Sequence, residues 1–133
     1  MNPQINIDDL IRDAKEDSWR QLEAIRSLGE TNNPKAVDEL INLLKVMPIK
    51  YNDQYEKIEK AYNVRWTAAK SLAKLNQYSI KALIDHLTSI ENKKDSSKEE
   101  QIVITEILWI LGEIRDESLL DVLNKYMRLR INP

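Results

Sequence analysis

The sequence predicts an all-α fold: a short α-solenoid (superhelix) of about three helix pairs, preceded by an N-terminal capping helix. The chain has only two Gly and four Pro among 133 residues, so few positions interrupt a helix. Apolar residues recur at helical spacing along most of it. One block occurs three times, at Leu28-Gly29, Leu72-Ala73 and Leu111-Gly112. In each block a helix pattern ends with Leu and a small residue, and a polar break and a second helix pattern follow. Such pairs bury their apolar faces by stacking.

The first two helices are expected near the N-terminus. The apolar residues of the first fall at i, i+3, i+4 and i+7, with Asn6 or Asp8 as its N-cap; they are Ile7, Leu10, Ile11 and Ala14. The second is expected to open at Asp17-Ser18 and to end at Gly29. These two segments give the capping helix and the first helix of block one.

The next two helices follow polar breaks. After the turn at 31–34, Asn33 is expected to cap a helix that has Pro34 at its first position, where the missing N–H costs nothing. From Asp53 a long helix carries Tyr55, Ile58, Tyr62, Trp66 and Ala69 at helical spacing. That spacing favours a place in the core for these aromatic residues.

The remaining helices complete blocks two and three. A break at Asn76-Gln77 precedes a helix that ends near the polar connector 91–98. A further helix is expected from about Glu99 to Glu113, and a turn at Arg115-Asp116 leads to the last one. Leu120, Leu123 and Met127 are expected to face inward there.

The three blocks align when Gly29, Ala73 and Gly112 are placed in register. The spacings are 44 and 39 residues (73 − 29 and 112 − 73), near the roughly 40–47 of helical-pair repeats. The predicted repeats are approximately 17–46, 53–90 and 99–129, within a single domain over 1–133. A chance alignment of amphipathic helices is the alternative.

Segments 24–29 (AIRSLG), 33–37 (NPKAV), 40–44 (LINLL) and 64–73 (VRWTAAKSLA) carry a family resemblance. They resemble the HEAT repeat, in the short HEAT-like form named after the phycobilisome (PBS) lyases, and the resemblance covers about 17–129. Block three departs from the pattern: Val103-Ile104 replaces Val-Arg, and Asp116 lacks its Pro. The resemblance implies an armadillo-like helical fold. Its members include bilin lyases, enzyme scaffolds and adaptors, so the fold does not fix the function.

No catalytic, cofactor-binding or metal-binding residues are predicted. The absence of Cys excludes disulfides, thiolate metal sites and cysteine nucleophiles. His86 is the only histidine, and its neighbour Asp85 does not face it on a helix; we expect a solvated or loosely paired side chain. Acidic pairs such as Asp8-Asp9 fall near helix starts, where they complement the helix dipole. An enzyme is therefore less expected than a non-catalytic protein, and no cofactor is expected.

Charge and hydropathy restrict partners and location. The net charge is −2, with +4 over residues 49–98 between two segments of −3 each, so a nucleic-acid partner is unlikely. The N-terminus lacks a signal-peptide pattern. No apolar run approaches the ~18 residues of a membrane span. The expected location is the cytoplasm.

The C-terminal block is the first candidate interface. Trp109 stands where earlier blocks have Arg26 and Lys70, and Ile104 where they have Gln21 and Arg65. A second apolar stripe runs along the last helix, and nothing follows to cover it. The predicted partner-binding residues are Ile104, Trp109, Leu119, Val122, Tyr126 and Leu129. The partner is another protein or a second copy, giving a homodimer through the C-terminal repeat; the alternative is that the tail or connector 91–98 covers this face.

The concave row of the second helices is the second candidate surface. Its predicted members are Asp38, Asn42, Lys45, Lys81, Asp85, Thr88, Asp121, Lys125 and Arg128. Their mixed charges suit a protein surface better than a phosphate backbone. A plain solvated face is an equally open interpretation.

The predicted function is a non-catalytic protein–protein interaction module, a small adaptor or scaffold. The alternative is a phycobilin lyase-related subunit or chaperone that acts on phycobiliprotein or bilin, with Tyr and Trp residues touching the pigment. A third hypothesis, a HEAT-like binder of DNA lesions, requires a basic concave face.

Overall fold

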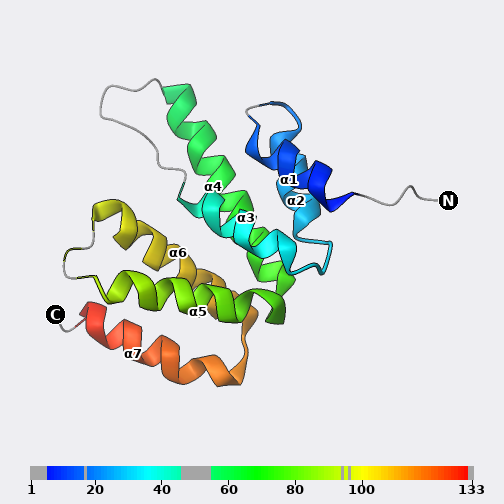
Figure 1. The fold of residues 1–133 in the computed structure, drawn as a ribbon. Coiled ribbons are helices and arrows are strands. Elements are labelled where there is room, and N and C mark those ends of the chain that lie inside the picture. Colours follow the sequence, from blue (N-terminus) through cyan, green and yellow to red (C-terminus); the bar gives the residue numbers. More distant parts are fainter. Residues whose placement is uncertain (1–5, 17, 46–54, 94, 96, 132–133) are drawn as a thin grey trace.

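The computed structural model describes residues 6–16, 18–45, 55–93, 95 and 97–131. For residues 127–131 the description covers the backbone and not the side chains. The described residues form helices and contain no strand, which confirms the all-α prediction. The helices are α1 (Ile7–Lys15), α2 (Gln21–Leu28), α3 (Lys35–Leu44), α4 (Tyr55–Leu75), α5 (Gln77–Glu91), α6 (Lys98–Ile114) and α7 (Leu120–Ile131), with a 3-10 turn η1 at Glu117–Leu119 (Figure 1).

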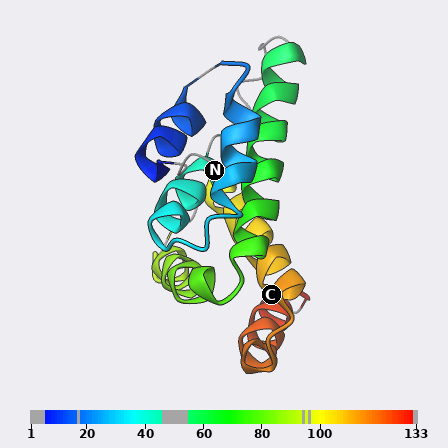
Figure 2. The ribbon, with the colours of Figure 1, turned by 90° about the vertical axis from the view of Figure 1, so that its right-hand side faces the viewer.

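Helices that hold the same place in successive blocks stack on one another. The first helices of the blocks, α2, α4 and α6, pack side by side, and the second helices α3 and α5 pack side by side in another layer (Figure 2). The helix α1 packs on α2 and α3, in the place expected of a capping helix. This layering is the arrangement that a repeat of helix pairs produces.

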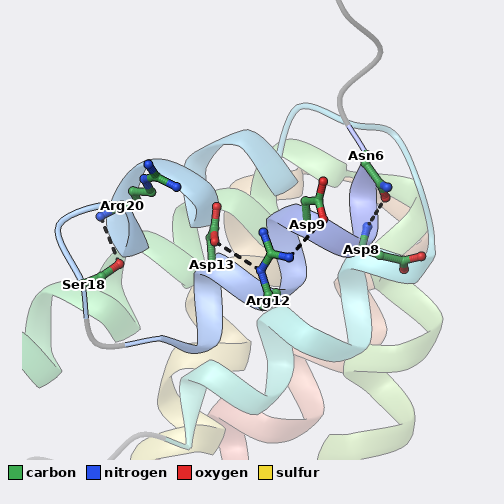
Figure 3. Close-up of polar contacts among 7 residues, drawn as sticks. All are labelled: Asn6, Asp8, Asp9, Arg12, Asp13, Ser18 and Arg20. Carbon is green, nitrogen blue, oxygen red and sulfur yellow. Dashed lines mark hydrogen bonds and ion pairs between the residues drawn. The ribbon is translucent and has the colours of Figure 1, made fainter.

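Polar side chains fix the start of the chain's helical part. The Asp8 N–H donates to Asn6 Oδ1 at 2.9 Å, which caps α1, and Arg12 lies between Asp9 and Asp13 (Figure 3). Ser18 Oγ accepts from the Arg20 N–H at 3.3 Å. Because Ser18 belongs to this turn, α2 begins only at Gln21, later than expected; Asp17 lies outside the described residues.

The other helix ends follow the sequence signals more closely. Asn33 Oδ1 accepts from the Lys35 N–H at 2.9 Å, but Pro34, expected at the first helical position, is the N-cap residue, and α3 begins at Lys35. Asn76, with φ 55°, separates α4 from α5. Ser97 and Glu100 form a reciprocal capping box at the start of α6, and Arg115 in the left-handed conformation ends that helix.

The helices α2 and α4 approach each other closely at Gly29. A Cβ added at Gly29 would lie 2.7 Å from Ser71 Cβ and 2.8 Å from Ser71 Cα. Ser71 Oγ donates to the Ile25 carbonyl at 2.9 Å across the same contact. The small residue that ends the first helix of block one therefore lets the second block stack on it, whereas a Cβ at Gly112 would meet nothing within 4 Å.

The expected core position of the α4 aromatics is wrong. Tyr55 is 76% exposed, Tyr62 60% and Trp66 40%. Helical spacing placed them on one face correctly, but that face lies between the contacts that α4 makes with α2 and α6. It points out of the first-helix layer instead of into the core.

The inward face of α7 also differs from the expectation. Leu120 was expected inside but is 57% exposed, whereas Leu119 and Tyr126 are buried. Leu123 is partly buried as expected, and the side chain of Met127 lies outside the described part. The 3-10 turn at Glu117–Leu119 turns Leu119 inward before α7 begins, and this rotates the whole helix.

Candidate functional site

A groove runs between α3 and α5 and continues towards the start of α6. One cavity of about 400 Å³ is lined by Asp38, Ile41, Asn42, Lys45, Ala82, Asp85, His86 and Ser89. A second cavity of about 300 Å³ is lined by Lys45, His86, Ser89, Ile90, Lys93, Glu99, Glu100 and Val103. Because Lys45, His86 and Ser89 line both, the two form one concavity, which we call the α3–α5 groove.

Helical spacing brings the groove residues together. On α3, residues 38, 42 and 45 follow one face, and on the adjacent α5 the facing positions are 82, 85, 86 and 89. Four residues of the predicted concave surface meet here, and all four are exposed at the rim; they are Asp38, Asn42, Lys45 and Asp85.

The rest of the predicted concave row does not line the groove. Lys81, Thr88, Asp121 and Lys125 are exposed but lie elsewhere on α5 and α7. Thr88 Oγ1 donates to the Ile84 carbonyl at 2.9 Å, within its own helix. The side chain of Arg128 lies outside the described part of the chain.

The charges along the groove are mixed. Asp38 and Asp85 line only the first cavity, Lys93 lines the second together with Glu99 and Glu100, and Lys45 lines both. Lys93 Nζ bonds Glu100 Oε2 at 2.8 Å, and this hydrogen bond, more than any other cause, lowers the pKa of Glu100. The groove therefore offers carboxylates at both ends and the ammonium group of Lys45 between them.

His86 lies between these charges and is half-buried. Its pKa is lowered from the ordinary value, first by burial and then by the positive charges of Lys45 and Lys93, with a smaller opposing effect from Glu100. A lowered pKa keeps the imidazole neutral at pH 7. His86 therefore presents a neutral polar ring, with one donor and one acceptor nitrogen, at the middle of the groove.

Half of the predicted partner-binding set is covered by the chain itself. Ile104, Leu119 and Tyr126 are 7%, 1% and 8% exposed, so the expectation that they lie on an uncovered face is wrong. Tyr126 packs against α5, where its hydroxyl donates to Glu91. Burial raises the pKa of Tyr126 to about 12, with a smaller contribution from Glu91.

The position of Ile104 is buried in all three blocks. Its counterparts Gln21 and Arg65 are 8% and 6% exposed although they are polar. Gln21 Nε2 donates to the Ala14 carbonyl at 2.9 Å, and Arg65 pairs with Glu106. The change to Ile104 therefore replaces a buried polar group and does not uncover an apolar one.

The remaining members of that set are separated in space. Trp109 lies on the first-helix layer, where its ring centroid is 4.7 Å from that of Trp66. Val122 is partly buried at α7, and the side chain of Leu129 is outside the described part. Partner binding through these residues stays a prediction.

A surface that the sequence did not reveal lies on the outside of α4 and α6. The large apolar side chains exposed there are Tyr55, Ile58, Tyr62, Trp66 and Ile102. A shallow cavity of about 100 Å³ lies between Tyr62, Trp66 and Trp109, above the Arg65–Glu106 pair. Helical spacing signals such a stripe, but only the positions of α2 and α6 decide that it is exposed.

The described residues offer neither a cluster of metal-ligating side chains nor a membrane-spanning helix. No group of three or more His, Cys, Asp or Glu side chains there is placed to hold a metal ion. None of the helices formed by these residues combines the length and apolar character that crossing a bilayer requires. The cytoplasmic location stays a prediction.

Comparison with known proteins supports the resemblance within the first block. The family model of the PBS lyase HEAT-like repeat matches residues 21–45. This stretch contains α2 and α3 in full, so the match covers one helix pair. The comparisons with curated proteins and with solved structures found no match.

Proposed function

We propose that this chain is a non-catalytic protein-interaction module that holds a segment of a partner protein in the α3–α5 groove. The observation that carries the proposal is the continuity of the two cavities, of about 400 and 300 Å³, along neighbouring second helices. A groove of this kind is long enough for several side chains of a bound segment. Stacked helix pairs commonly present such concave surfaces to partners.

The lining of the groove suits a peptide segment. Ile41, Ile90 and Val103 are 6%, 5% and 3% exposed and form the apolar floor of the groove beneath its polar rim. Protein interfaces combine an apolar centre with a polar, solvated rim in this way. Apolar anchors of the partner would supply most of the affinity.

The charges of the groove indicate what the segment carries. A basic side chain next to Asp38 and Asp85 and an acidic one next to Lys45 would both be matched. Such complementarity contributes to specificity and register more than to affinity. We therefore expect a partner segment with apolar anchors, a basic residue that meets Asp38 and Asp85, and an acidic residue that meets Lys45.

Selection from a random-peptide display library tests the proposal. Peptides enriched on the wild-type protein should follow the expected pattern and should lose about tenfold or more in affinity for Asp85→Arg, because tenfold corresponds to about 1.4 kcal/mol, the order of one charge contact. Affinity is measured by fluorescence anisotropy of labelled peptides.

Asp121→Arg is the matched control, since Asp121 belongs to the predicted concave row but does not line the groove. It makes the same charge change on an exposed residue of α7 and should leave the affinity unchanged. Enriched peptides that bind Asp85→Arg as tightly as the wild type would contradict the proposal. So would a library that yields no binder.

The bilin-related role remains the alternative. The cavity between the exposed aromatics Tyr62, Trp66 and Trp109 holds about 100 Å³, whereas small-molecule pockets usually have at least about 300 Å³. The aromatic face therefore favours a protein partner over a buried pigment. A change of visible absorbance on mixing with a bilin would instead support the alternative.

A further inference from the structure

The outer face of α4 carries a stripe of residues that is largely exposed. Residues at i, i+4, i+7, i+11, i+15 and i+18 share one side of an α-helix. In α4 this side is formed by Tyr55, Glu59, Tyr62, Trp66, Lys70 and Ala73, which we call the α4 stripe. All of them are exposed except Ala73, which is partly buried.

The first turns of α4 are exposed to solvent. Each residue from 55 to 60 is exposed, and this end of α4 extends beyond α2 in Figure 2. Short helical turns with little tertiary packing have little stability in water. A surface that buries Tyr55 would add packing to this end of the helix.

The exposed aromatic area supplies most of the apolar area that an interface needs. The fractions 76%, 60% and 40% for Tyr55, Tyr62 and Trp66 correspond to roughly 350 Å² at about 200 Å² per aromatic side chain. A standard interface buries about 800 Å² per partner, of which about 450 Å² is apolar. Ile102 and Trp109 on α6 extend the apolar surface beside the stripe.

The stripe complements itself when two copies run antiparallel. With the two-fold axis near residue 64, Tyr62 of one copy faces Trp66 of the other. Glu59 then faces Lys70, a pair of opposite charges, and the large Tyr55 faces the small Ala73. A parallel arrangement would place Glu59 against Glu59 and Tyr55 against Tyr55, which pairs like charges and crowds the two large rings.

We propose that two copies of this chain form a two-fold symmetric dimer in which the α4 stripes pack antiparallel. The contact is isologous, as in most homodimers. It uses the first-helix layer, on the side away from the α3–α5 groove, so the inference is independent of the proposed function. Trp109, from the predicted partner-binding set, lies at its edge beside Trp66.

Sedimentation equilibrium tests the dimer. The wild type should show a reversible monomer–dimer equilibrium at concentrations up to about 200 µM, a range that detects even weak self-association. Tyr62→Glu should raise the dissociation constant tenfold or more, because it places two carboxylates at the centre of the contact. Tyr62 is exposed, so the variant should keep its helical circular dichroism.

Tyr78→Glu is the matched control, because Tyr78 is an exposed tyrosine on α5 outside the stripe. It should dimerise like the wild type. A wild type that stays monomeric at the highest concentration would overturn the proposal, and so would equal effects of Tyr62→Glu and Tyr78→Glu.

Cross-linking tests the antiparallel register, which is practical because the chain contains no cysteine. A mixture of Glu59→Cys and Lys70→Cys should form a disulfide between copies on mild oxidation. Neither variant alone should do so, since identical positions would lie about 16 Å apart at ~1.5 Å rise per residue, beyond disulfide reach. A disulfide between two Glu59→Cys chains, with no disulfide between Glu59→Cys and Lys70→Cys chains in the mixture, would overturn the antiparallel dimer.

The two proposals fail separately. Groove peptides should bind Tyr62→Glu as tightly as the wild type, so a monomeric wild type that still binds them overturns the dimer alone. A dimer for which Asp85→Arg does not change peptide binding overturns the groove alone.

Discussion

The contact between α4 and α6 contains a buried ion pair between Arg65 and Glu106. The two side chains are 8% and 22% exposed. The pKa of Glu106 is raised: burial, the larger effect, outweighs the opposing charge and hydrogen bond of Arg65. For the Glu106 carboxylate, burial thus outweighs what the pairing with Arg65 returns. Buried pairs of this kind are costly to break but cheap to replace as a pair.

We therefore predict strong non-additivity between Arg65 and Glu106. Arg65→Met or Glu106→Leu alone should lower the free energy of unfolding by about 3 kcal/mol, since each leaves one buried charge unpaired. The double variant should lie within about 1 kcal/mol of the wild type, because apolar side chains of similar size fill the same space. Urea unfolding of all four proteins gives the coupling energy. Additive losses would contradict this account.

This pair also shows what the sequence could not reveal about single residues. Arg65 occupies a position that the repeat pattern made recognisable, but its polarity indicated a solvated face. Its partner Glu106 lies 41 residues away in sequence, and only the stacking of α6 on α4 brings the two together. Ile104, in the equivalent position, was therefore assigned to the surface although it is buried.

Among the helices, the repeat pattern itself makes a prediction at its two glycines. Gly29 and Gly112 end equivalent helices, but only Gly29 has a following block stacked on it. Gly29→Ala should destabilise the fold by about 2 kcal/mol, since the new methyl would overlap the α4 backbone at Ser71. Gly112→Ala should stabilise it by roughly 0.5–1 kcal/mol, because Ala is the better helix former and the site is open.

Chemical denaturation of the two variants against the wild type measures both changes. The opposite signs are the test, because helix propensity alone would make both substitutions stabilising. Two stabilising substitutions would show that α2 and α4 do not approach as closely as the contact of Gly29 with Ser71 requires.

Helix orientation was harder to predict than helix existence. Every helix has an apolar face in the sequence, yet α7 leaves Leu120 exposed while Leu119 in the 3-10 turn before it is buried, and α4 has more apolar residues than its own neighbours bury. In both helices the period was correct. Which side is covered depends on the neighbouring helices, and a single helix pattern does not contain that information.

For the whole molecule, the order and pairing of helices were predictable because each block is one repeated unit. Aligning Gly29, Ala73 and Gly112 placed first helices with first helices, and the structure stacks them so. The groove was predictable in part for the same reason: Asp38, Asn42, Lys45 and Asp85 follow from the period of the second helices. Its extension towards α6 was not, because Val103 joins it only through the packing of α6 on α5.

The two proposed surfaces lie on different layers of the molecule, and together they predict avidity. A dimer joined through the α4 stripes would carry two grooves that face away from each other, so it would bridge two partner molecules instead of enclosing one. A free peptide should therefore bind the wild type and Tyr62→Glu with equal affinity. On a surface densely coated with the same peptide, the wild type should dissociate about 10²-fold more slowly than Tyr62→Glu, because a released groove rebinds while the other groove of the dimer still holds its peptide. Surface plasmon resonance at high and low peptide density separates this effect from the affinity of a single groove, since sparse coating prevents simultaneous engagement of both grooves. Equal dissociation of the two proteins from the dense surface would show that the grooves of one particle do not act together.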